Sequence, residues 1–156
     1  MTSKTETSEG QVAEYVTAMI GGQLFGLPIS RVQDVFMPDR LTRVPLSTAE
    51  IAGVLNLRGR IVTLIDMRSR LGLEKREEGA AVMAIGVEAR GESYGLLIDS
   101  IGEVLKLAGE SCEPNPVNLD PRLARVSAGI HRLEGQLLMV LDVDRVLDID
   151  TKTMAA

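Results

Sequence analysis

The alternation of apolar and polar residues predicts a chain of short strands joined by tight turns. Val32–Phe36 alternates over five positions, as a strand with one buried face does. Gly21-Gly22 separates two apolar runs and predicts a two-residue hairpin turn. The pattern recurs along the chain. The expected strands are Glu14–Ile20, Gln23–Pro28, Val32–Phe36, Gly53–Leu57, Arg60–Asp66, Ala80–Ala89, Glu92–Ile98, Ile101–Leu107, Ser127–Leu133 and Gln136–Asp142.

Only short helices are expected. Ser47 and Thr48 suit the N-cap of a helix that ends at Ala52. Asp66 and Asp142 each end an apolar strand, where a carboxylate can accept hydrogen bonds from the first free N–H groups of a helix. The helices that follow them would be Met67–Leu71, ended by Gly72, and Val143–Asp148. Loops are expected over Met37–Leu46, Glu74–Gly79 and Glu113–Pro121.

An internal repeat is the most informative pattern. The segment 53–60 aligns with 129–136, and the register continues without a gap, so that Asp66 matches Asp142. In the earlier strands, 26–29 aligns with 95–98 and 34–35 with 103–104. Each half alone would be only marginally stable at that size, whereas packing both together buries more apolar surface. We therefore expect a mainly β protein, with two SH3-like five-stranded β-barrels packed through a shared hydrophobic layer and a few short helices.

The expected organisation is one domain between two tails. Residues 1–12 and 151–156 would be disordered tails, and 13–150 a single domain. Within it, a first barrel would take about 13–72 together with a C-terminal helix at 143–150, and a second barrel about 80–142.

Composition narrows the functional classes. The chain has 156 residues and a net charge of −5, without the basic face of a generic nucleic-acid binder. A single cysteine, Cys112, excludes an intramolecular disulfide framework and suits a reducing compartment. No run of about 18 apolar residues occurs, so no membrane insertion is expected.

Catalytic chemistry is poorly represented. The only histidine, His131, aligns with Leu55 of the other repeat, which favours a partly buried strand residue. One histidine and one cysteine cannot build the usual His/Cys metal site. An acid–base pair formed by Asp66 and Asp142 is an alternative to their capping role. We expect no catalytic residue, metal or cofactor.

Several residues suit a binding surface instead. Arg58 occupies a predicted hairpin tip, and arginine is common both at solvated turns and at interface hot spots. Asp34 could offer it a partner. Four aliphatic residues at equivalent positions of the two halves could line their junction, although apolar strand residues more often belong to the ordinary core. They are Val32, Val35, Ile101 and Val104.

Residues 56–68, NLRGRIVTLIDMR, resemble the hallmark of the CheW family of bacterial chemotaxis proteins. The blocks 51–54, 26–35, 94–99 and 101–105 resemble further parts of the family pattern, so the resemblance covers about Val12 to Leu147. It implies two SH3-like barrels and a non-enzymatic adaptor that couples methyl-accepting chemoreceptors to the histidine kinase CheA. The absence of kinase, phosphotransfer and receiver segments favours a freestanding adaptor. The implied setting is the cytoplasm, with recruitment to receptor arrays at the membrane.

The resemblance also implies partners and site residues. The partners would be the regulatory domain of CheA, the cytoplasmic tip of chemoreceptors, and further copies of CheW-like proteins. Asp34 stands where the family commonly has Glu, which keeps the charge and shortens the reach. The receptor-binding groove would comprise Val32, Asp34, Val35, Arg58, Ile101 and Val104, and the coupling hairpin Gly53, Asn56, Leu57, Gly59 and Ile61.

Overall fold

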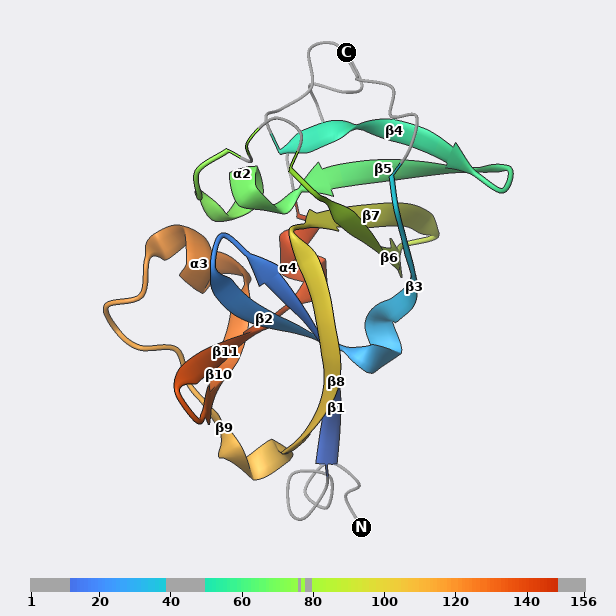
Figure 1. Ribbon diagram of the computed structural model, residues 1–156. Coiled ribbons are helices and arrows are strands. Elements are labelled where there is room, and N and C mark those ends of the chain that lie inside the picture. Colours follow the sequence, from blue (N-terminus) through green and yellow to red (C-terminus); the bar gives the residue numbers. More distant parts are fainter. Residues whose placement is uncertain (1–11, 39–49, 76, 78–79, 149–156) are drawn as a thin grey trace.

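Two β-sheets form the molecule in a computed structural model that describes residues 12–38, 50–75, 77 and 80–148 (Figure 1). Of the predicted tails 1–12 and 151–156, residues 1–11 and 151–156 lie outside the described residues, whereas Val12 already belongs to a strand, so the tail prediction is wrong at that residue. One sheet has six strands in the order β8 (Ser100–Ala108), β1 (Val12–Ile20), β2 (Gln23–Pro28), β11 (Gln136–Leu141), β10 (Ser127–Leu133) and β9 (Cys112–Glu113). The other has five, in the order β3 (Val32–Phe36), β6 (Met83–Ala89), β7 (Glu92–Ile98), β5 (Arg60–Asp66) and β4 (Ile51–Leu57).

The sheets divide the chain differently from the predicted barrels. The five-stranded sheet uses residues 32–98, and the six-stranded sheet is made from the segments on either side of it, 12–28 and 100–141. The assignment of one barrel to 13–72 and the other to 80–142 is therefore wrong. The reason is that β1 and β2 pair with β8 and β11 of the second half rather than with strands of their own half.

The internal repeat is nevertheless confirmed, with its first hairpins exchanged. The first hairpin is β1–β2 in one repeat and β6–β7 in the other. Each sheet combines one of these hairpins with the remaining strands of the other repeat, and equivalent strands follow the same order in both sheets. The parallel contacts have the same register, because Gly26 lies opposite Val140 in one sheet and Gly95 lies opposite Leu64 in the other. Each half thus completes the sheet of its neighbour.

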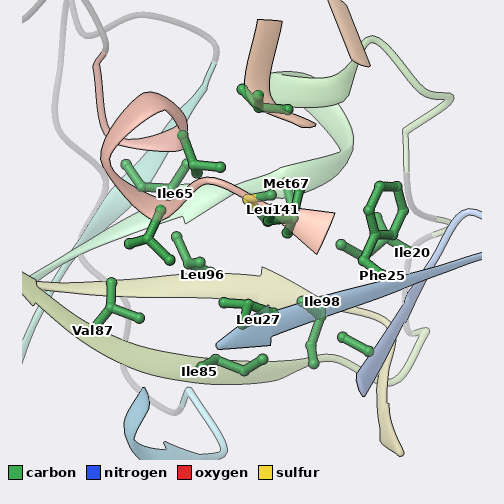
Figure 2. Packing of buried hydrophobic residues seen from close by; sticks show 14 of the residues in the cluster. Ile20, Phe25, Leu27, Ile65, Met67, Ile85, Val87, Leu96, Ile98 and Leu141 are labelled. Atoms are coloured by element: carbon green, nitrogen blue, oxygen red, sulfur yellow. The ribbon is translucent and has the colours of Figure 1, made fainter. Parts of the chain in front are cut away.

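Three hydrophobic clusters fill the molecule. The largest draws on both sheets and forms the predicted shared layer; Figure 2 shows Leu27 of β2 next to Ile85, Leu96 and Ile98 of the other sheet. Each sheet also has a smaller cluster of its own, centred on fully buried Leu64 in one and Leu138 in the other. This division into a shared layer and two inner cores fits two SH3-like units packed together.

In the described ranges of the chain, three short α-helices cap the strands and pack against one another. They are α2 (Met67–Leu71), α3 (Pro121–Val126) and α4 (Val143–Val146), and α4 lies between the sheets in Figure 1. Asp66 accepts hydrogen bonds from the N–H groups of Arg68 and Ser69, and Asp142 accepts one from Arg145. The predicted capping role of both aspartates is therefore confirmed.

One helix prediction and one loop prediction were wrong in part. Ile51 and Ala52 belong to strand β4, because Ile51 pairs with Ile65 and is buried, whereas Ser47 and Thr48 lie outside the described residues. The expected loop Glu113–Pro121 ends at helix α3, which begins with Asp120 as its N-cap and Pro121 in its first turn. Both residues favour the start of a helix. The sequence analysis did not use this signal, because the neighbouring prolines favoured a loop.

Candidate functional site

The hairpin between β4 and β5 holds its tip in a strained conformation. Arg58 and Gly59 have positive φ values of 54° and 84°, as a two-residue hairpin turn of type I′ requires. The side chain of Asn56 accepts a hydrogen bond of 2.9 Å from the N–H of Gly59, which fixes the turn. An arginine with a positive φ is less favourable than a glycine, so the turn holds the Arg58 backbone in a conformation that costs conformational free energy.

Arg58 faces Asp34 from the opposite edge of the same sheet. The Arg58 side chain is 78% exposed, and its guanidinium lies 3.8 Å from the Asp34 carboxylate. Asp34 belongs to β3 and Arg58 to the hairpin of β4, which are the two edge strands of the five-stranded sheet. The ion pair therefore closes the sheet toward a barrel, and the expected pairing of these residues is confirmed.

The four aliphatic residues of the expected groove divide into two kinds. Val32 and Ile101 are half-buried and pack against the shared core, as the ordinary structural explanation requires. Val35 and Val104 are 40% and 47% exposed on the edge strands β3 and β8. Each pair holds equivalent positions in the repeat, so each sheet presents one exposed valine on its edge.

The hairpin residues also divide by position. Ile61, beside the tip, is 62% exposed, and Leu57 is half-buried in the inner core of its sheet. Gly53 is buried in β4 with φ 154°, at a register shift in its pairing with β5. Its equivalent, Gly129, has φ 149° at the matching shift in β10. Gly53 therefore lies within strand β4, away from the exposed tip of the hairpin.

The sequence analysis missed two residues, one beside this surface and one on the equivalent hairpin of the other sheet. Gly86 pairs directly with Asp34 across β3 and β6. A glycine inside an expected strand signals a close approach, and this signal was available. Leu137 is 38% exposed on the hairpin of β10 and β11. It is the repeat equivalent of Ile61, so the repeat alignment could have identified it.

His131 lies inside the six-stranded unit, away from this hairpin. It is 1% exposed, and its Nδ1 and Nε2 lie 3.1 Å from the Ser111 hydroxyl and 3.4 Å from the Tyr15 hydroxyl. Burial lowers the pKa of His131, although Glu113 opposes the shift. This confirms the expected buried strand position.

Reactive and metal-binding groups are few in the part of the chain that the structure describes. Burial raises the pKa of the Cys112 thiol, and Glu113 adds to the effect, which disfavours the reactive thiolate. Among the described residues, no three His, Cys, Asp or Glu side chains cluster as metal ligands would. None of the described helices is both long and apolar enough to cross a membrane.

Known proteins share both the sequence pattern and the fold. A family model described as the CheW-like domain matches residues 14–150. "Chemotaxis protein CheW" of Helicobacter pylori is 27% identical over 95% of this chain and 88% of that protein. "Chemotaxis protein CheW" of Bacillus subtilis is 26% identical over 99% and 97%. The crystal structure of the scaffolding protein TtCheW from Thermoanaerobacter tengcongensis is 28% identical, with a TM-score of 0.80, and covers 91% of this chain and 97% of that one. With the double-sheet fold and the hairpin built around Arg58, the chain belongs to the CheW-like domain family.

Proposed function

We propose that this chain is a non-enzymatic adaptor of bacterial chemotaxis that couples methyl-accepting chemoreceptors to the histidine kinase CheA. The observation that carries the proposal is the exposed guanidinium of Arg58, held at a strained hairpin tip beside Asp34. The turn geometry alone does not mark a function, because Arg90 shares it. Exposed arginines are, however, enriched among interface hot spots. Family membership supplies the class of partner, since the matched relatives are chemotaxis proteins.

The proposed receptor contact combines this charge with nearby apolar surface. The groove for the cytoplasmic tip of a chemoreceptor would use Val32, Asp34, Val35, Arg58, Ile101 and Val104. A helical hairpin that docks there would bury the exposed valines and meet one charged centre, as helix-in-groove recognition does. The coupling hairpin, formed by Gly53, Asn56, Leu57, Gly59 and Ile61, would support Arg58 and offer the exposed Ile61.

An adaptor needs at least two surfaces, and the repeat supports two. Two pairs of repeat-equivalent aliphatic residues are exposed, Val35 with Val104 and Ile61 with Leu137. The receptor groove would use the two valines, which leaves Ile61 and Leu137, on the two equivalent hairpins, for the regulatory domain of CheA or another copy of a CheW-like protein. Through these contacts the chain would be recruited from the cytoplasm to receptor arrays.

The decisive experiment reverses one charge. Arg58→Glu is expected to weaken binding to a soluble chemoreceptor hairpin at least tenfold, because interface arginines are frequent hot spots and the reversal places two carboxylates together. Isothermal titration would measure affinity for the receptor hairpin and, separately, for the CheA regulatory domain. A pull-down with all three proteins would test bridging.

Arg90 provides a matched control. It also occupies a hairpin tip with positive φ, 52°, between β6 and β7. Arg90→Glu introduces the same charge change in the same turn geometry and is expected to leave receptor affinity within about twofold. Equal effects of both reversals, or no binding of the unmodified chain to either partner, would refute the proposed role.

Two rival functions have less support. Single-strand nucleic-acid binding needs exposed aromatic side chains, but Tyr15 and Phe25 are buried and Phe36 and Tyr94 are half-buried. Acid–base catalysis by Asp66 and Asp142 competes with their hydrogen bonds to helix N–H groups.

A further inference from the structure

We propose that Gly86 is a positioning residue for the receptor-binding surface: the absence of a side chain there lets the Asp34 carboxylate lie across strand β6 and face Arg58. This inference rests on the proposed function, since it concerns the same surface. It adds a residue that lies on a different strand from both members of the ion pair.

The close approach of Asp34 to Gly86 carries the inference. The two residues are direct partners in the antiparallel pair of β3 and β6. Opposed residues in such a pair place their Cβ atoms on the same face of the sheet. A Cβ on Gly86 would lie 3.3 Å from the Asp34 Cγ and would overlap the Asp34 Oδ1 atom. The carboxylate therefore occupies the space that any other residue at position 86 would fill.

The two oxygens of the carboxylate point to different neighbours. Oδ1 lies over Gly86, and Oδ2 lies 3.8 Å from the Arg58 guanidinium. A methyl group at position 86 would displace Oδ1, so the carboxylate must rotate as a rigid unit and Oδ2 must move with it. Because 3.8 Å is near the limit of an ion pair, even a small rotation changes the contact with Arg58.

The side chain of Asp34 is short enough for this arrangement to matter. It has only two rotatable bonds, Cα–Cβ and Cβ–Cγ, and it is 29% exposed. It therefore has few other ways to reach Arg58 from β3. A Glu at position 34 would extend the carboxylate by one methylene and carry it beyond the space over Gly86.

The test is a double-mutant cycle on the full-length chain. Gly86→Ala, Asp34→Ala and the double variant would be compared for affinity to a soluble chemoreceptor hairpin by titration calorimetry. Gly86→Ala is expected to weaken binding by about the same factor as Asp34→Ala, roughly two- to fivefold, the range that an exposed ion pair supports. The double variant should be no weaker than either single variant, because both remove the same contact.

Two further variants separate positioning from general damage to the sheet. Gly26→Ala adds a methyl that would lie 3.2 Å from Leu138 and 3.3 Å from Tyr15, in the other sheet, and should change urea stability without changing receptor affinity. Asp34→Glu combined with Gly86→Ala should restore affinity to within about twofold of the unmodified chain, because the longer side chain avoids the methyl.

The outcomes distinguish this inference from the proposed function. If Asp34→Ala weakens binding and Gly86→Ala does not, or if the two losses multiply in the double variant, Gly86 does not act through Asp34. If no substitution at 34, 58 or 86 changes receptor binding, the proposed surface itself is wrong. In that case urea unfolding still tests the contact: Gly86→Ala must destabilise the chain when Asp34 is present and must be less harmful in the Asp34→Ala background.

Discussion

At the scale of single residues, the two units differ most in their interiors. His131 and Tyr15 face one another inside the six-stranded unit, with ring centroids 5.4 Å apart. The repeat equivalents in the other unit, Leu55 and Ala84, are apolar and buried. Ser111 donates a hydrogen bond to the carbonyl of Ala108, so its oxygen can accept the Nδ1–H of a neutral imidazole. Nε2 then accepts from the Tyr15 hydroxyl.

This buried imidazole predicts a pH-dependent stability. The pKa of His131 in the folded chain lies below its ordinary value, because burial disfavours the charged ring. In the unfolded chain His131 takes up a proton as the pH falls below about 6.5. In the folded chain the same ring takes up a proton only at lower pH. The free energy of unfolding is therefore expected to fall between about pH 7 and pH 5 and to be insensitive to this group above pH 7.

Urea unfolding across that pH range would test the prediction. His131→Leu, which copies the apolar residue of the other repeat, should remove part of the slope between pH 7 and pH 5. Carboxylates contribute to the acid dependence of any protein, so the comparison is between the two slopes. Identical slopes for the variant and the unmodified chain would show that His131 ionises alike in both states.

At the scale of elements, a buried arginine joins the ends of the two repeats. Arg70 of α2 is 9% exposed and donates hydrogen bonds to the carbonyls of Val146, Arg145 and Asp148, at 2.9, 2.8 and 3.2 Å. These carbonyls lie at the C-terminal end of α4, where helix carbonyl groups lack partners within the helix. Arg70 thus caps α4 from another helix.

Replacing Arg70 should therefore loosen α4. Arg70→Met is expected to lower the free energy of unfolding by about 2–4 kcal/mol, because three charge-assisted hydrogen bonds are lost and the carbonyl of buried Val146 loses the Arg70 donor. Arg70→Lys should recover only part of the loss, since an ammonium group cannot reproduce the planar fork. Urea unfolding measures both.

Arg145 offers the matched control on α4 itself. Its side chain is 58% exposed and lies 3.5 Å from the Asp142 carboxylate. Arg145→Met removes a surface ion pair and should cost less than about 1 kcal/mol. A loss as large as that of Arg70→Met would show that the helix depends on its surface charge and not on the buried cap.

At the scale of the whole molecule, the exchange of first hairpins makes the two halves interdependent. The hairpin β1–β2 has its sheet partners, β8 and β11, in the other half, and β5 pairs with β7 across the same division. An isolated two-stranded hairpin is at best marginally stable in water. Neither half can complete a sheet from its own strands.

Cutting the chain between Gly79 and Ala80 tests this interdependence. Each fragment alone is expected to lack the dispersed amide spectrum of a folded β protein, and an equimolar mixture should regain it. Two-dimensional NMR of the fragments and of the mixture gives the answer. A native-like spectrum from either fragment by itself would mean that the predicted contiguous barrels describe the stable units better than the exchanged sheets do.

Local features of the sequence determined much of this protein. Alternation and glycine turns predicted ten of the strands, apart from errors at their ends, and the positions of Asp66 and Asp142 predicted two helix caps. The repeat predicted two like units with a shared hydrophobic layer. These features are local, because side-chain periodicity and turn chemistry depend on neighbouring residues only.

Tertiary structure alone decided which strands pair and what surrounds Arg58. The two repeats present nearly the same strand pattern, so a first hairpin could join either set of remaining strands without changing any local preference. The folded chain adopts the exchanged arrangement, in which both first hairpins contribute residues to the shared core. The folded chain also places Gly86 opposite Asp34. The two residues are far apart along the chain, so the local periodicity of the sequence could not predict this contact. The sequence thus determined the parts and the hairpin tip, and only the folded contacts determined how that tip is held.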